Sequence, residues 1–206
     1  MVAENLEKRF GRTRLWRIDR LELKAGETVH LRGENGSGKT TLLKILAGLQ
    51  SPENGSVLIN NARVKLGEKV CYLHQQPYMF DRSVKGNLAL VLSARRESAK
   101  VKQQQLEDAL HWSGLEKQAD QLARTLSGGE RQALAMARAR LCQPSFWLLD
   151  EPTASLDEKG VTKCVELVKT LRESGAAILL TTHQQGELTQ ICDHTWWMKD
   201  GHLVPE

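Results

Sequence analysis

The residues from Gly33 to Thr40 read GENGSGKT and follow the pattern G-x-x-x-x-G-K-[ST]. Glycines allow the backbone to wind so that successive N–H groups point at one anion, and the N-terminus of a following helix adds partial positive charge. In this pattern Lys39 reaches the β- and γ-phosphates of a nucleotide, and the hydroxyl of Thr40 can hold Mg²⁺. We therefore predict a phosphate loop here; the alternative is a flexible loop that only caps a helix.

Two adjacent carboxylates end the apolar run in FWLLDEP, where Asp150 and Glu151 are followed by Pro152. Ligands gather at the carboxyl ends of parallel strands, so these acids and the phosphate loop are expected at the same sheet edge. There Asp150 would bind Mg²⁺, directly or through water. Glu151 would then be free to act as general base toward an attacking water, whereas an ordinary pair of surface acids is the alternative.

A second anion site is suggested by LSGGERQALAMARARL, in which Glu130 follows Ser127 by three residues. That spacing is typical of a capping box and predicts the start of a helix. As a cap alone, the motif needs no functional explanation. However, Ser127 with Gly128 and Gly129 also exposes N–H groups at a helix start, where an anion can bind.

The flanks of the phosphate loop predict the elements that position it. Residues 21–24 alternate, Ala25-Gly26 marks a turn and Thr28 to Leu31 follows, so we expect two strands joined by a tight turn. After the loop, apolar residues at 42, 43, 45, 46 and 49 predict a buried helix. Residues 51–66 indicate a β-hairpin with turns at Asn54-Gly55 and Asn60-Asn61, and residues 69–74 another strand.

The last third of the chain alternates strands and helices. Strands are expected at residues 146–150 and 176–183, with a helix between them that carries apolar residues at 161, 164, 165, 168 and 171. A short helix and the segment HTWWMKDGHLV complete the pattern. Short apolar runs that alternate with amphipathic helices predict a parallel sheet covered on both faces, so the fold class is α/β.

Polar helical segments interrupt this pattern from about Ser83 to Leu122. In VKQQQLEDALHWSGL four apolar residues can share one face: Val101, Leu106, Ala109 and Leu110. We predict an inserted helical subdomain at 83–122 within a single domain of 206 residues, whose core and β subdomain comprise 1–82 and 123–206.

The composition indicates a folded chain, with 40% hydrophobic and 26% charged residues. Neither an apolar run near 18 residues nor a secretory signal is seen, so a cytoplasmic protein is expected. The net charge is +4, but the basic residues are mostly spread along the chain and no nucleic-acid-binding motif accompanies them. No nucleic-acid partner is therefore expected. Cys71, Cys142, Cys164 and Cys192 lack metal-ligand spacing and are interpreted as buried reduced thiols.

Together these motifs resemble those of ATP-binding-cassette (ABC) ATPases. Five segments follow the family order over nearly the whole chain: GENGSGKTT, Gln75 in CYLHQQPYMF, LSGGERQALAMARA, FWLLDEPTASLD and LLTTHQ. The resemblance implies a P-loop NTPase with a RecA-like core, an antiparallel β subdomain and a helical subdomain. It also implies that two cassettes, as a homodimer or a cassette pair, close head to tail around two ATP molecules.

The resemblance further implies a role for each matching residue, with ATP and Mg²⁺ as ligands. Phe10 would stack on adenine, with Trp16 as second candidate and a core aromatic as the alternative. The phosphates would be held by Gly33, Glu34, Asn35, Gly36, Ser37, Gly38, Lys39, Thr40 and Thr41. Gln75 would sense Mg²⁺ and the attacking water, and His183 would orient that water and the γ-phosphate.

Other residues would act on the nucleotide of the partner cassette. These are Ser127, Gly128, Gly129 and Glu130, here called the signature segment, while Asp157 would lie at the dimer seam. Four positions depart from the commonest family pattern: Phe10, Glu130, Ala133 and Gln184. All are mild departures, so an active ATPase is expected.

Three functions compete for such a cassette: the energising subunit of a membrane transporter, a soluble cassette outside transport, and a non-hydrolysing sensor. A single cassette without a coiled-coil insertion favours transport. Gln75 to Leu88 resembles the segment whose groove receives a permease helix, with Tyr78, Met79 and Phe80 as exposed apolar anchors. Ordinary packing of these three residues is the alternative.

The segment QQPYMFDRSV resembles cassettes of bacterial importers, including those for tungstate or molybdate. Its short length also resembles that of the cassettes of haem-export and cofactor-uptake systems. We expect an importer subunit on the cytoplasmic face of the inner membrane, with an exporter subunit as the alternative.

Overall fold

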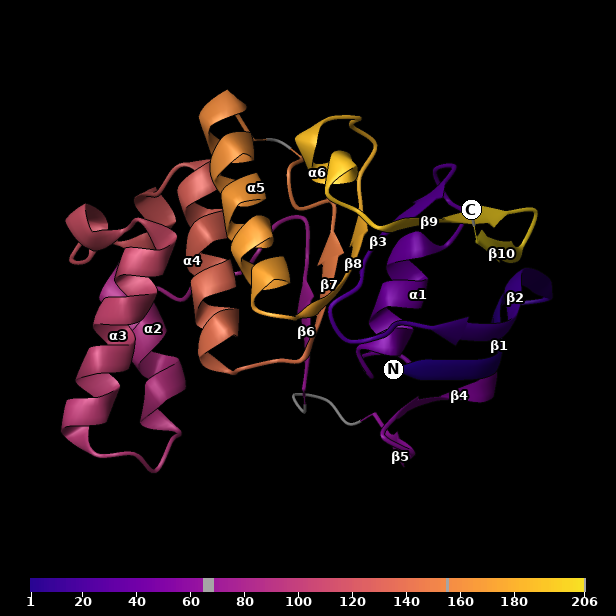
Figure 1. The fold of residues 1–206 in the computed structure, drawn as a ribbon, viewed down its shortest axis with the longest axis horizontal. Coiled ribbons are helices and arrows are strands. Elements are labelled where there is room, and N and C mark those ends of the chain that lie inside the picture. The colour runs from indigo at the N-terminus through magenta and orange to yellow at the C-terminus, as the bar shows by residue number, and fades with distance from the viewer. Residues whose placement is uncertain (65–68, 155, 206) are drawn as a thin grey trace.

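Two β-sheets and the helices packed around them make up the structure (Figure 1). The computed structural model describes residues 1–64, 69–154 and 156–205. Within these residues no helix is both long enough and apolar enough to cross a membrane.

The smaller sheet is antiparallel and has the strand order β2-β1-β4-β5. Its strands are β1 (Val2–Phe10), β2 (Thr13–Glu22), β4 (Asn54–Ile59) and β5 (Ala62–Arg63). The hairpin between β1 and β2 brings Phe10 opposite Thr13. Phe10 therefore stands at the end of this sheet.

The larger sheet has the order β10-β9-β3-β8-β7-β6 and is parallel except for the edge strand β10. Its strands are β3 (Thr28–Gly33), β6 (Val70–Leu73), β7 (Phe146–Asp150), β8 (Ala177–Thr181), β9 (His194–Lys199) and β10 (His202–Pro205). Every residue of β7 and β8 is buried. Their near-continuous apolar sequences follow from this, since both faces of these strands are covered.

Helices cover both faces of the larger sheet (Figure 1). Helix α1 (Lys39–Leu46) lies on one face, and α4 (Gly128–Leu141) and α5 (Glu158–Glu173) lie on the other. Alternate residues of β7 divide between the two cores: Leu148 belongs to the α1 side and Leu149 to the α4 side. A short helix, α6 (Glu187–Gln190), precedes β9.

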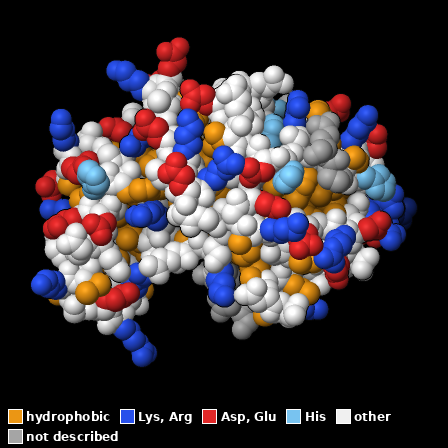
Figure 2. Space-filling view, viewed as in Figure 1, with side chains coloured by type: hydrophobic (Ala, Val, Ile, Leu, Met, Phe, Trp, Pro, Cys, Tyr) orange, Lys and Arg blue, Asp and Glu red, His pale blue; other side chains and the backbone are white. Residues whose placement is uncertain are grey.

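A helical part lies at the end of the molecule away from the smaller sheet (Figure 1). It contains α2 (Val84–Ser93) and α3 (Ala99–Ser113), followed by the 3₁₀ segments Glu116–Gln118 and Ala123–Thr125. Ser83 and Ser98 cap α2 and α3 by accepting backbone N–H bonds. Figure 2 shows a notch in the surface outline beside this part, and acidic and basic side chains interspersed over the face in view.

The structure confirms the α/β class and the parallel sheet covered on both faces. The two strands expected on either side of the Ala25-Gly26 turn are also present, but they belong to different sheets. Strand β2 pairs with β1 in the smaller sheet, whereas β3 lies in the larger one. Alternation in residues 21–24 marked only the end of a ten-residue strand.

One expectation was wrong: Asn54-Gly55 begins β4 and is not a turn. Gly55 is needed there because an added Cβ would lie 2.4 Å from the carbonyl oxygen of Glu4 in the neighbouring strand. The turn at Asn60-Asn61 is present, with both residues at positive φ. The hairpin residues expected at 65–66 lie outside the described chain.

The prediction of four buried thiols was only partly correct. Cys164 is buried and Cys71 and Cys192 are intermediate, but Cys142 is exposed at the end of α4. All four are free. Burial raises the pKa of the Cys71 thiol to about 12, which makes it a poor nucleophile near neutral pH.

Candidate active site

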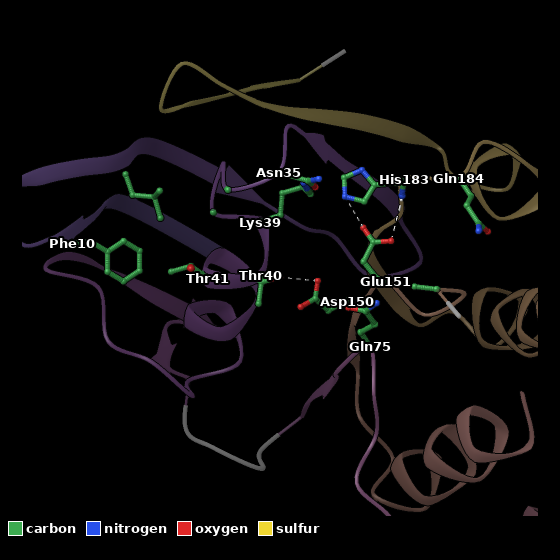
Figure 3. A pocket seen from close by; sticks show the side chains of 14 residues that line it. Phe10, Asn35, Lys39, Thr40, Thr41, Gln75, Asp150, Glu151, His183 and Gln184 are labelled. Atoms are coloured by element: carbon green, nitrogen blue, oxygen red, sulfur yellow. Dashed lines mark hydrogen bonds and ion pairs between the residues drawn. The ribbon is translucent and has the colours of Figure 1, made fainter. Parts of the chain in front are cut away.

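A cavity of about 650 Å³ runs from Phe10 at one end to His183 and Gln184 at the other (Figure 3). Its size suits a ligand such as a nucleotide. Most predicted nucleotide-binding residues of the first half of the chain line it together with the two strand-end acids and His183: Phe10, Asn35, Gly36, Gly38, Lys39, Thr40, Thr41, Gln75, Asp150, Glu151 and His183. Gly33, Glu34 and Ser37 line a neighbouring cavity of about 780 Å³ with Trp197 and Met198.

The phosphate loop joins β3 to α1, as its pattern predicts. Gly38 is the N-cap residue of α1 and has φ +94°, in the left-handed region. An added Cβ would lie 2.6 Å from Leu15 Cδ2 and from Trp16 Nε1. Both the backbone conformation and the space therefore require glycine at this position, where the loop lines the cavity.

Lys39 lies over the phosphate loop with its ammonium group bound to backbone carbonyls. Nζ donates to the oxygens of Gly33 (2.7 Å) and Glu34 (3.0 Å). Burial lowers the pKa of Lys39, and the nearby carboxylates of Glu151 and Asp150 partly oppose that shift. A phosphate group that enters the cavity would offer this cation stronger acceptors than the neutral carbonyls.

Asp150 ends β7 and is held at both carboxylate oxygens. Oδ1 accepts hydrogen bonds from the hydroxyls of Thr40 (3.1 Å) and Thr181 (3.0 Å), and Oδ2 accepts one from Tyr72 (2.9 Å). Burial raises the pKa of the Tyr72 hydroxyl, and the neighbouring carboxylate adds to that shift, so the group is a neutral donor. Hydroxyl and carboxylate oxygens at Thr40 and Asp150 fit the ligand preference of Mg²⁺.

Glu151 follows β7 in the left-handed region, with φ +51°. Its N–H donates to Thr181 Oγ1 at 2.9 Å, which fixes this unusual conformation for a residue with a side chain. The carboxylate points toward His183 (Figure 3): Oε2 accepts from the His183 N–H and Oε1 lies 3.3 Å from Nε2. The two residues that the resemblance places beside the attacking water are therefore in contact.

The two candidate adenine-stacking aromatics differ sharply in exposure. Phe10 is 59% exposed and stands at the end of the cavity (Figure 3). Trp16 is 0% exposed and packs against Gly38, so the second candidate was wrong. Gln75 lines the cavity just beyond β6, on the side where Asp150 lies.

The signature segment lies elsewhere: among described residues, the lining of the main cavity includes neither it nor Asp157. Ser127 caps α4 in the predicted capping box, which is confirmed: its hydroxyl accepts from the Glu130 N–H, and the Glu130 carboxylate accepts from the Ser127 N–H. Asp157 caps α5 through the Gly160 N–H at 2.9 Å. The neighbouring Ser155 lies outside the described residues.

Glu130 also accepts a hydrogen bond from the Gln118 side chain at 3.0 Å. The Glu130 carboxylate thus accepts hydrogen bonds from two groups of its own chain, the Ser127 N–H and the Gln118 side chain. Sequence reasoning missed this contact, and it missed Tyr72 and Thr181 as partners of Asp150. Their only sequence signal is a hydroxyl in an otherwise apolar strand close to a strand end.

With this geometry established, comparisons with known proteins decide the family. The family model described as "ABC transporter" matches residues 17–154. The chain belongs to the ABC transporter family. A lipopolysaccharide export system ATP-binding protein, LptB of Escherichia coli K12, is 33% identical over 99% of this chain and 88% of its own length. The tungstate uptake system ATP-binding protein TupC of Peptoclostridium acidaminophilum is 31% identical, over 98% of this chain and 96% of its own.

Solved ABC cassettes have the same fold. A dimeric, post-hydrolysis cassette bound to ADP and Pi, MJ0796, superposes with a TM-score of 0.86 at 28% identity, covering 100% of this chain and 98% of its own. The cassette cbiO1 from Clostridium perfringens, part of the ABC transporter complex cbiONQ, superposes with a TM-score of 0.88 at 26% identity, covering 98% and 86%. This ABC protein is therefore an ATP-binding ATPase with the P-loop cassette fold.

Proposed function

We propose that this ABC ATPase energises an importer, with ATP hydrolysed between two cassettes by the residues of the main cavity. The observation that carries the proposal is the convergence of Lys39, Asp150, Glu151 and His183 on one cavity of nucleotide size. Phosphoryl transfer needs positioning and charge stabilisation at such a site, and these residue types supply both.

The predicted site residues that line the cavity have the following proposed roles. Lys39 and the loop N–H groups bind the β- and γ-phosphates, and Phe10 stacks on the adenine ring. Thr40, Asp150 and Gln75 hold Mg²⁺, which when bound supplies positive charge against the phosphate oxygens. Because Lys39 is already buried and rests on neutral carbonyls, it can turn to the phosphates without leaving bulk water.

Glu151 is the proposed general base. Its side chain is mostly buried, with 17% of its surface exposed, and the contact with His183 fixes its direction. A proton taken from water at a carboxylate oxygen of Glu151 would leave hydroxide aimed at the γ-phosphate. His183, held beside it, would orient that water and the phosphate oxygens.

The signature segment and Asp157 are proposed to serve the nucleotide of a second copy. Their separation from the main cavity supports this, since an anion-binding helix start has no function at a site it does not line. The MJ0796 cassette forms a dimer in its post-hydrolysis state, which supports the same arrangement here.

A groove beside β6 and α4 is the proposed permease contact. It has a volume of about 410 Å³ and is lined by Cys71, Phe80, Val91 and Arg138, among others. Of the three expected anchors only Tyr78 is strongly exposed, at 72%. Met79 and Phe80 are partly buried, and Phe80 packs under Arg138, whose Cζ lies 5.0 Å from the ring centroid.

The direction and cargo are proposed from relatives alone. The near end-to-end match to TupC, a tungstate uptake protein, favours import of an oxyanion. The match to LptB, an export protein, makes export the second candidate.

The base is tested by Glu151→Gln. The variant should bind ATP and form a dimer that persists, while phosphate release falls by roughly two orders of magnitude or more, because the amide cannot accept the proton. Dimerisation is measured by size-exclusion chromatography with ATP, and turnover by phosphate release. Near-normal turnover would reject the role.

The transport proposal is tested in cells that carry the chain with its permease. A Tyr78→Ala variant should lose co-purification with the permease but keep ATP binding, and Tyr78→Phe is the matched control. Cellular tungsten and molybdenum should rise with the wild-type cassette and not with Glu151→Gln. Unchanged metal content would reject oxyanion import.

A further inference from the structure

Asp150 is gripped from the two strands that flank β7. Thr181 at the end of β8 donates to Oδ1, and Tyr72 in β6 donates to Oδ2. The strand order β8-β7-β6 puts these donors on opposite sides of the carboxylate. Only Thr40, the third donor, belongs to the phosphate loop.

The register explains how Tyr72 reaches so far along the sheet. Tyr72 pairs with Leu148, two residues before Asp150. In a strand, residues two apart point to the same face, so Tyr72 and Asp150 share the α1 side of the sheet. The long phenol ring then spans the distance along the strand and brings its hydroxyl to 2.9 Å from Oδ2.

The two flanking donors would remain when Thr40 turns to a metal ion. Thr181 is buried at 0% exposure and also accepts the Glu151 N–H, so it is fixed in place. With Oδ2 tied to Tyr72, the other oxygen of Asp150 stays directed at Thr40. A phenylalanine at position 72 would free the carboxylate to rotate.

We propose that Tyr72 is a positioning residue that orients the Asp150 carboxylate for Mg²⁺ and links the strand leading to Gln75 to the metal site. Gln75 follows Tyr72 by three residues, just beyond the end of β6. A displacement of the Gln75 segment would therefore reach the metal carboxylate through one hydrogen bond. The inference deepens the proposed function and rests on the metal role assigned there to Asp150.

The test compares ATP affinity with and without Mg²⁺ in Tyr72→Phe, measured with a fluorescent ATP analogue in EDTA and in excess Mg²⁺. Outer partners of metal ligands typically contribute tenfold or more to metal affinity, so the gain in affinity from Mg²⁺ should fall roughly tenfold. The Mg²⁺ concentration that half-saturates turnover should rise by a similar factor. Affinity in EDTA should be unchanged, which excludes a general loss of structure.

Two matched variants make the result decisive. Thr162→Val removes an exposed hydroxyl that donates to the Glu158 carbonyl oxygen within α5, and it should behave as wild type in the affinity test. Asp150→Asn should abolish the Mg²⁺ gain. If Asp150→Asn abolishes it and Tyr72→Phe retains all of it, the positioning role is refuted; if Asp150→Asn itself retains the gain, the proposed metal site and this inference fail together.

Discussion

We propose two sets of residues for one reaction, and the structure holds the two sets in different ways. The proposed cis set comprises Phe10, the phosphate loop, Gln75, Asp150, Glu151 and His183, and all of it except Gly33, Glu34 and Ser37 lines one cavity. The trans set, comprising the signature segment and Asp157, caps helices α4 and α5. The cis side chains make contacts that a nucleotide would replace, such as Lys39 on backbone carbonyls. The trans side chains satisfy the helix ends of their own chain.

This difference indicates how the proposed trans residues keep their conformation in a single copy of the chain. A capped helix start is stable on its own, because its first N–H groups have acceptors. The trans set is also rigidly joined: Gly129 and Gly160 pack backbone to backbone, and a Cβ on Gly129 would lie 2.7 Å from Gly160 Cα. The signature segment and the Asp157 cap should therefore move as one unit.

The largest expected effect comes from removing the cis cation. Lys39→Ala should weaken ATP binding and lower turnover by roughly 10²- to 10³-fold, since no other group in the loop supplies that charge. Fluorescent-ATP binding and phosphate release measure it. Lys24→Ala, at an exposed turn lysine, is the control. Undiminished turnover in Lys39→Ala would break the account of the cis set.

A smaller effect, on dimerisation and not on ATP affinity, is expected from a substitution in the trans set. In Gly160→Ala the new Cβ would lie 3.1 Å from Gly129 Cα and 3.0 Å from Asp157 Oδ1. Overpacking of this kind should weaken the ATP-dependent dimer by roughly tenfold, while ATP affinity of the single copy stays unchanged.

Sedimentation in a Glu151→Gln background measures that dimer. Gly186→Ala is the matched control, because its Cβ meets nothing within 4 Å. An equal loss of ATP affinity in Gly160→Ala would show that the two sets are not separable.

The smallest expected effect is on the stability of the fold and concerns His30. This residue lies in β3 and contacts Thr182, the residue before His183. Burial lowers its pKa below the ordinary value of 6.5, and Nε2 lies 3.2 Å from the Thr182 carbonyl oxygen. The unfolded chain then binds the proton more tightly, so stability is complete above the unfolded pKa and falls as pH drops through the folded pKa.

Urea unfolding at pH about 7.5 and about 5.5 tests this. The loss for wild type should exceed that for His30→Gln by at most about 1.4 kcal/mol per pH unit, while His202→Gln, at an exposed histidine, should match wild type. An equal loss in wild type and His30→Gln would contradict the prediction.

Short sequence motifs correctly predicted those features that depend only on residues close together in the chain. The phosphate loop, the acids ending β7 and the Ser127–Glu130 cap all follow from short motifs, and each was found where expected. The same reasoning predicted the strands on either side of Ala25-Gly26 but not that they lie in different sheets, because alternation reveals a strand and not its partner.

Contacts between distant segments were beyond the sequence. The Tyr72–Asp150 bond joins residues 78 positions apart and depends on the register of β6 against β7. Likewise, two candidate anion-binding helix starts are visible in the sequence, but only the packing of α4 shows that its start lies outside the main cavity.

The central claim is that one working site combines the cis set of one copy with the trans set of another. Mixing a Glu151→Gln copy with a Ser127→Arg copy tests it most directly, by phosphate release from the mixture and from each variant alone. In a mixed dimer one site carries both defects and the other carries none, so activity should reappear on mixing. A mixture no more active than its two inactive components would contradict the claim.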